Sequence, residues 1–181
     1  LILCNPNNPT SSALTCDELE ALVVLCKERG IFVMLDETYV EFAPSVDKIT
    51  AVPLVPRYDN LMLLRGISKF FAAPGLRLGY GITSNRAFLD NLKQHQNPWS
   101  LNSLGAFAGE QMLKDRDYIQ RTRELILSER SKCMAVLKTF RYVKVYPAYG
   151  NFILIKLLKK GLTSFDVFEH AIRQGMMLRD C

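Results

Sequence analysis

The feature that most constrains the fold is an unbroken apolar run at residues 31–35, which ends at Asp36. A run without polar interruption is typical of a strand covered on both faces, as in a parallel sheet. A second apolar run, residues 1–4, precedes it, and a helix is predicted between the two. Strand, helix and strand in this order form a βαβ unit with a right-handed crossover. The chain is therefore predicted to be an α/β protein with a mostly parallel sheet.

The predicted crossover helix has a start signal and a stop signal. Thr15 and Glu18 have the spacing of a capping box, in which each side chain satisfies a backbone N–H group of the first turn. Gly30 is the type of residue that follows the last turn of a helix. The helix carries one apolar stripe, formed by Leu19, Leu22, Val23 and Cys26.

Three polar side chains follow predicted strands. Asn8 follows the first strand and Asp36 the second, while Lys69 follows a strand predicted at residues 61–64. The carboxyl ends of parallel strands meet at one edge of a sheet, where the functional groups of such folds collect. We therefore expect these three residues to lie along one edge.

The second half of the chain indicates a different architecture. We expect residues 1–122 to form the C-terminal part of a large α/β domain and residues 123–181 an incomplete, smaller α+β domain. The boundary then falls inside a long amphipathic helix, residues 117–138. The other predicted elements are a strand at 78–83, a helix at 86–93, a helix capped by Ser100 or Asn102, strands at 142–146, 151–157 and 177–179, and a helix at 164–174.

Composition narrows the function classes. The chain has 181 residues, a net charge of +5 and 49% apolar residues, which is typical of a folded globular domain. Its basic residues are interleaved with glutamates, so we expect no nucleic-acid partner, and no apolar run is long enough to cross a membrane. Five cysteines without a C-x-x-C pair predict neither disulfides nor a metal site and favour the reducing cytoplasm.

The loop after residue 64 combines groups suited to covalent chemistry. Among Phe70 and Phe71, Lys69 would lose solvation, which favours the neutral amine that forms a Schiff base. Arg77 has the planar fork that suits a phosphate, and Ser68 adds a hydroxyl donor. Alternatively, Lys69 and Arg77 are ordinary solvated residues.

These residues suit one cofactor jointly. If pyridoxal 5′-phosphate binds at this edge, Asp36 keeps its pyridine nitrogen protonated, so that the ring withdraws electrons from the substrate. Tyr39 and Asn8 would then donate hydrogen bonds to the phenolic oxygen of the ring. Asp36 taken alone is equally well explained as a helix cap or turn former.

The sequence resembles the fold-type I pyridoxal-phosphate enzymes of the aminotransferase superfamily. The resemblance rests on Asn5-Pro6-Asn7-Asn8-Pro9-Thr10, on Asp36-Glu37-Thr38-Tyr39, and on Ser68-Lys69 with Arg77 eight residues further on. It covers essentially the whole chain. It implies catalytic roles for Lys69, Asp36 and Tyr39, and cofactor contacts from these three residues and from Asn8, Ser68 and Arg77.

Two groups within the superfamily are most similar. Residues 97–104 and the ending Leu178-Arg179-Asp180-Cys181 resemble threonine-phosphate decarboxylases of cobalamin biosynthesis, and histidinol-phosphate aminotransferases are the next group. Both use a phosphorylated amino compound, and the resemblance implies that Asn8 and Arg179 bind the substrate. It also implies a homodimer, for which Trp99 would supply a buried contact unless it belongs to the core. A non-catalytic regulatory module with this fold is the alternative from another class.

The chain departs from the family pattern at two positions. Relatives often have glycine where Ser11 stands, and a hydroxyl residue where Gly66 stands, so Gly66 removes a possible phosphate contact. Family members also continue at both ends. We therefore expect the chain to be a fragment that lacks an upstream phosphate turn, a ring-stacking aromatic residue and a downstream arginine.

Overall fold

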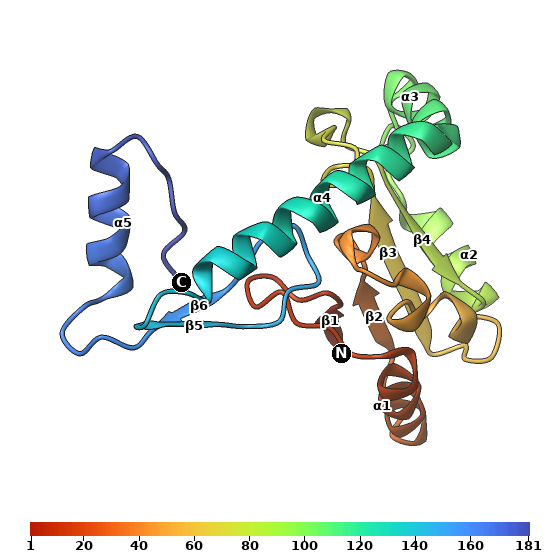
Figure 1. Cartoon of the computed structure of the whole chain (residues 1–181). Coiled ribbons are helices and arrows are strands. Elements are labelled where there is room, and N and C mark those ends of the chain that lie inside the picture. The colour runs from red at the N-terminus through yellow and green to blue at the C-terminus, as the bar shows by residue number, and fades with distance from the viewer.

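A four-stranded sheet forms the first half of the protein. The computed structural model describes all residues, 1–181, and is shown in Figure 1. The strands β1 (Ile2–Cys4), β2 (Val33–Asp36), β3 (Leu61–Gly66) and β4 (Gly79–Thr83) lie in this order across the sheet. The first three strands are parallel, and β4 is antiparallel to β3. This confirms the expected mostly parallel sheet.

Helix α1 (Cys16–Glu28) is the crossover between β1 and β2. Thr15 and Glu18 form the expected capping box, and Gly30 follows the helix in left-handed backbone with a φ of 66°. Leu19 and Val23 of the helix are buried and pack against the sheet in the main core cluster. The predicted start and end of this helix are confirmed.

The strand β2 is covered less evenly than its apolar sequence predicts. Val33 and Leu35 are buried, with exposed fractions of 1% each, whereas Met34 and Asp36 on the other face are only half-buried. The face that carries Leu35 packs in the core with Leu61 and Leu63 of β3. The expected cover on both faces is thus complete on one face and partial on the other, and the half-buried face carries Asp36.

Four 3₁₀ helices lie between the strands β2, β3 and β4, and three α-helices follow β4. The 3₁₀ helices are η1 (Val40–Phe42), η2 (Val46–Lys48), η3 (Val52–Leu54) and η4 (Pro74–Leu76). The α-helices are α2 (Arg86–His95), α3 (Ser103–Lys114) and α4 (Arg116–Leu137). Asn102, not Ser100, caps α3, because its side chain accepts a hydrogen bond from the Gly105 N–H group.

Helix α4 is continuous through residue 123, where the sequence places the domain boundary. In Figure 1 it runs from the side of α3 towards β5 (Val143–Val145) and β6 (Ile155–Leu157), an antiparallel pair, with α5 (Ser164–Arg173) beyond them. The strand predicted at residues 151–157 is thus reduced to its last three residues. The strand predicted at 177–179 was wrong: β5 and β6 pair only with each other, and residues 176–181 have no regular structure.

None of the helices has both the length and the apolar character that crossing a membrane requires. Nor does the structure bring three or more His, Cys, Asp or Glu side chains together in a group that could hold a metal ion.

Candidate active site

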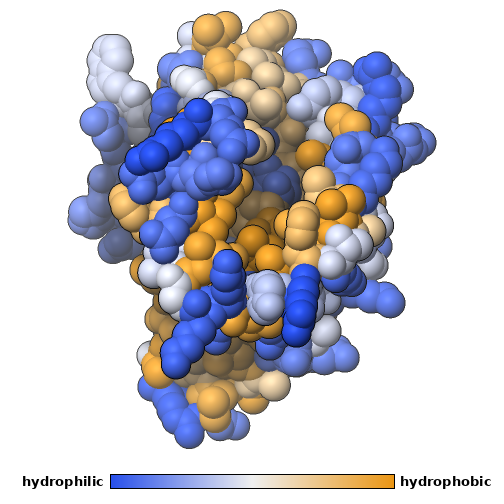
Figure 2. All heavy atoms as spheres, turned by 60° about the vertical axis from the view of Figure 1, so that its left-hand side comes forward, coloured by the Kyte–Doolittle hydropathy of each residue, from blue (hydrophilic) through white to orange (hydrophobic).

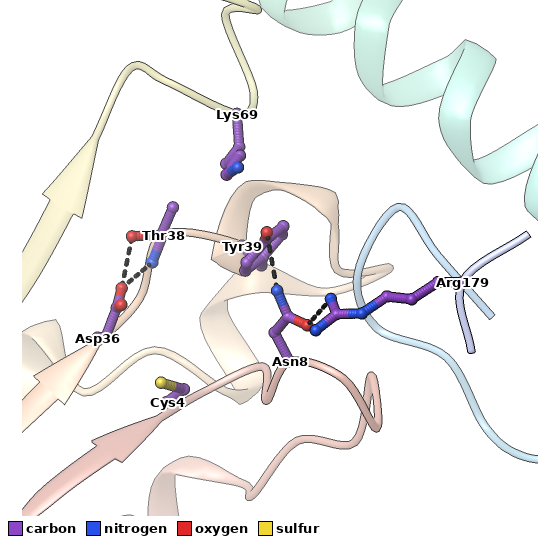
Figure 3. A pocket seen from close by; sticks show the side chains of 7 residues that line it. All are labelled: Cys4, Asn8, Asp36, Thr38, Tyr39, Lys69 and Arg179. Atoms are coloured by element: carbon purple, nitrogen blue, oxygen red, sulfur yellow. Dashed lines mark hydrogen bonds between the residues drawn. The ribbon is translucent and has the colours of Figure 1, made fainter. Parts of the chain in front are cut away.

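A cavity of about 510 Å³ lies where β1 and β2 end (Figure 3). In the parallel sheet Cys4 pairs with Asp36, so the two strands end side by side. Side chains from both strand ends, from the loop after β3 and from the C-terminal segment face this cavity. The lining residues are Cys4, Asn8, Asp36, Thr38, Tyr39, Lys69 and Arg179.

Asp36 presents one carboxylate oxygen that the protein leaves free. The backbone N–H of Thr38 donates to Asp36 Oδ1 at 2.8 Å, and the Thr38 hydroxyl donates to the same oxygen. These two bonds orient the carboxylate, and Oδ2 makes no hydrogen bond within the chain. An oriented acceptor of this kind fits a protonated ring nitrogen.

Lys69 reaches the cavity from the loop after β3, as Figure 3 shows. Its Nζ lies 6.0 Å from the centre of the Tyr39 ring. Lys69 is exposed, whereas Phe70 is buried with an exposed fraction of 2%. The expectation that the neighbouring phenylalanines desolvate the amine was therefore wrong: Phe70 packs near Phe42 and does not cover Lys69.

Tyr39, Asn8 and Arg179 form a chain of hydrogen bonds along the cavity (Figure 3). The Asn8 Nδ2 group donates to the Tyr39 hydroxyl oxygen at 3.2 Å. Arg179 Nη1 donates to Asn8 Oδ1 at 3.0 Å, although the two residues are 171 positions apart. The structure thus brings together five of the residues singled out from the sequence, namely Asn8, Asp36, Tyr39, Lys69 and Arg179.

Ser68 and Arg77 do not line this cavity. Ser68 is half-buried, and Arg77 is exposed in left-handed backbone with a φ of 52°. Arg77 Nη1 donates to the Pro74 carbonyl oxygen at 3.0 Å. Phosphate contacts from these two residues remain predictions.

Cys4 and Thr38 line the cavity but were not predicted to do so. Burial, and then the nearby charge of Asp36, raises the pKa of the Cys4 thiol. The feature that could have predicted a place for Cys4 in the cavity is its position at the end of β1, opposite Asp36. The signal for Thr38 is its spacing of two residues from Asp36, which allows the short side-chain turn observed here.

A second cavity of about 600 Å³ adjoins the first and shares Asn8, Tyr39, Lys69 and Arg179 with it. Its remaining lining is mostly apolar and comes from α4, β6, α5 and the C-terminal segment. On this side of the molecule, apolar side chains gather around a hollow framed by hydrophilic ones (Figure 2). The combined space therefore has one polar end, at the sheet, and one apolar end.

The side chains at the polar end fit pyridoxal 5′-phosphate. A free carboxylate oxygen, a hydroxyl, an amide and a primary amine meet in one cavity whose volume is within the range of small-molecule sites. These are the groups that the ring nitrogen, the phenolic oxygen and the aldehyde carbon of this cofactor require.

Residues 1–177 match the family described as aminotransferase class I and II. The chain belongs to this family of pyridoxal-phosphate enzymes. This confirms the superfamily and the cofactor expected from the sequence.

The relatives bear two activity names. A Caldanaerobacter subterraneus protein provisionally named a threonine-phosphate decarboxylase is 37% identical over 99% of this chain and 48% of its own length. A histidinol-phosphate aminotransferase of the same organism is 36% identical over 99% of this chain and 48% of its own length. The chain thus spans about half the length of the curated relatives it matches.

The fold is similar to that of a solved histidinol-phosphate aminotransferase from Clostridium acetobutylicum. The TM-score is 0.91 at 28% identity, and the match covers 98% of this chain and 53% of that structure. This confirms the fold-type I architecture.

Proposed function

We propose that the protein decarboxylates L-threonine O-3-phosphate with pyridoxal 5′-phosphate, a reaction of cobalamin biosynthesis in the group that the sequence resembles. The observation that carries the proposal is the position of Arg179. Its guanidinium lines the same cavity as Asp36, Tyr39 and Lys69 and contacts Asn8. A planar guanidinium beside a cofactor site is suited to a phosphate group on the substrate.

Each side chain of the site has its own part in this reaction. Pyridoxal phosphate, when bound, withdraws electrons from the carbon that loses the carboxylate. Lys69 Nζ would be the amine that holds the cofactor, and it would give way to the substrate amine. Asp36 Oδ2 would hold the proton on the ring nitrogen, and the Tyr39 hydroxyl would donate to the phenolic oxygen. Arg179 and Asn8 would bind and orient the substrate, and Arg77 and Ser68 would hold the cofactor phosphate.

Transamination of histidinol phosphate is the second candidate, because the solved structure with a TM-score of 0.91 is named a histidinol-phosphate aminotransferase. Both reactions use the same groups, and they differ in which bond of the substrate is held perpendicular to the ring. Residues 97–104 and the Arg179-Asp180-Cys181 ending favour the decarboxylase. A non-catalytic module would not need a lysine, an aspartate and a tyrosine facing one cavity.

The test uses the full-length protein supplied with pyridoxal phosphate. Threonine phosphate should be converted to carbon dioxide and a phosphorylated amine, and clean transamination of histidinol phosphate without carbon dioxide would reject this choice. Lys69→Ala should lose both turnover and the cofactor that borohydride fixes on the protein. Lys93→Ala, which changes an exposed lysine of α2, is the control and should keep both.

We further propose that the protein is a cytoplasmic homodimer. Trp99 has an exposed fraction of 90%, and Leu104 and Phe107 of α3 are 67% and 66% exposed. Trp99 is thus exposed in this chain, and an apolar surface of this kind favours a protein contact. Sedimentation of fully active protein as a monomer at micromolar concentration would refute the dimer.

A further inference from the structure

Ser11 occupies a backbone conformation that disfavours a side chain. It is fully buried, and its φ of 59° lies in the left-handed region, where glycine is the usual residue. A serine in this conformation costs conformational free energy. The contacts of its hydroxyl therefore have to explain why a serine stands here.

The Ser11 hydroxyl receives hydrogen bonds from a distant turn. The Gly150 N–H group donates to Ser11 Oγ at 2.8 Å, and the Tyr149 N–H group donates to it at 3.1 Å. Tyr149 N also donates to the Ser11 carbonyl oxygen at 2.8 Å. Ser11 therefore joins the loop after β1 to the turn before β6.

The same turn is held from a second side. Arg130 of α4 is buried, and its Nη1 donates to the Gly150 carbonyl oxygen at 2.6 Å and to the Phe42 carbonyl oxygen at 2.9 Å. A Cβ atom on Gly150 would lie 3.0 Å from the Phe152 ring and 3.2 Å from Ser11 Oγ. The turn is thus enclosed between Ser11, Arg130 and Phe152 with no room for a side chain.

This turn determines where Phe152 meets the candidate site. The Phe152 ring packs edge-on against Tyr39, with ring centres 5.2 Å apart. Tyr39 in turn accepts the hydrogen bond from Asn8, and Phe152 lines the apolar cavity next to Lys69. Ser11 thereby acts on the site through two residues that lie closer to it.

We propose that Ser11 is a positioning residue, whose hydroxyl fixes the Tyr149–Gly150 turn and thereby holds Phe152 against Tyr39. Ser11 itself lines neither cavity. The catalytic part of this inference rests on the proposed function, whereas the fixing of the turn does not.

The first test measures the turn without any reaction. Hydrogen exchange of the full-length protein is followed by mass spectrometry in peptides that contain residues 149–150, for wild type, Ser11→Gly and Ser12→Ala. Ser11→Gly relieves the backbone cost but removes the hydroxyl, so the Gly150 amide should exchange about 5- to 10-fold faster. Ser12→Ala changes the exposed neighbouring hydroxyl and should exchange like wild type. Wild-type exchange in Ser11→Gly would overturn the proposal.

The second test separates positioning from a purely structural role. The KM of Ser11→Gly should rise about 2- to 10-fold, as expected for loss of an aromatic edge contact, while kcat stays near the wild-type value. Faster exchange with an unchanged KM would reduce Ser11 to a structural hydrogen bond and overturn the positioning role.

A second variant acts on the turn from its other side. Gly150→Ala keeps the serine hydroxyl but places a Cβ atom 3.0 Å from the Phe152 ring and 3.2 Å from Ser11 Oγ, so it should displace Phe152 and raise KM in the same way. The KM is measured with whichever of threonine phosphate and histidinol phosphate the wild type turns over. Failure of the proposed function therefore appears in the wild type, and failure of the present inference appears only in the variants.

Discussion

Replacement of Glu37 by glutamine should destabilise the protein strongly, although the two side chains have the same shape. The Glu37 side chain is fully buried, and its carboxylate accepts hydrogen bonds from Ala51 N at 2.7 Å, Thr50 Oγ1 at 2.9 Å and Arg65 Nη2 at 2.7 Å. Burial pulls the pKa of Arg65 down, but the charges of Glu37 and Glu41 outweigh it, so that this pKa lies above its ordinary value.

The size of the expected loss in unfolding free energy follows from the buried charge of Arg65 that glutamine leaves unpaired. Removing one partner of a buried ion pair costs about 3–5 kcal/mol, because the other charge stays buried without compensation. Glutamine keeps one acceptor oxygen, and Arg65 keeps its contact with Glu41 at 3.2 Å, so we expect a loss of about 3 kcal/mol. Glu41→Gln is the matched control: this side chain is 33% exposed, and its loss should cost about 1 kcal/mol or less.

Equilibrium urea unfolding of the full-length protein, followed by circular dichroism, measures both variants. Arg65→Met should cost less free energy of unfolding in the Glu37→Gln background than in wild type, with a coupling of about 0.5–3 kcal/mol. Equal losses for Glu37→Gln and Glu41→Gln, or strictly additive losses for Glu37 and Arg65, would refute the reasoning.

Three further predictions concern the site and the first helix. Arg179→Ala should raise the KM for the phosphorylated substrate roughly 10- to 100-fold in steady-state kinetics, which corresponds to the free energy of a hydrogen bond to a charged group. Arg173→Ala, which changes an exposed arginine of α5, is the control and should leave the KM unchanged. Burial and the charge of Asp36 raise the pKa of the Cys4 thiol, so iodoacetamide should modify this partly buried thiol more slowly than the exposed Cys181; equal rates for the two would contradict this. Thr15→Ala removes the capping box of α1 and should lower the free energy of unfolding by about 1 kcal/mol in urea titrations, and an unchanged midpoint would contradict this role of the cap.

The sequence predicts the fold best where the signals are local. The Thr15 and Glu18 pair specifies the start of α1 within four residues of chain, and that start is confirmed. Pairing between strands is not local, because a short apolar segment does not carry the identity of its neighbour. The strand expected at residues 177–179 failed for this reason: its residues suit a strand, but no strand of the chain pairs with them.

The site was predictable as far as it depends on strand ends. Asn8, Asp36 and Lys69 meet because the parallel strands before them end at one edge of the sheet. Which side chains of the loop after β3 are exposed could not be predicted in the same way. Phe70 follows Lys69 in the sequence, but successive side chains of a loop point in different directions, and only Phe70 enters the core.

The orientation of the Asn8 side chain links the substrate end of the site to the cofactor end. Its Oδ1 accepts from Arg179, so its Nδ2 group must be the one that faces Tyr39. The opposite orientation would place amide hydrogens against the guanidinium hydrogens and leave Arg179 without this acceptor. Because the Tyr39 oxygen accepts from Asn8, its own proton is free to be donated into the cavity. Replacement of Arg179 should therefore alter the hydrogen bonding of the Tyr39 hydroxyl, because the Asn8 side-chain amide is bonded to both residues.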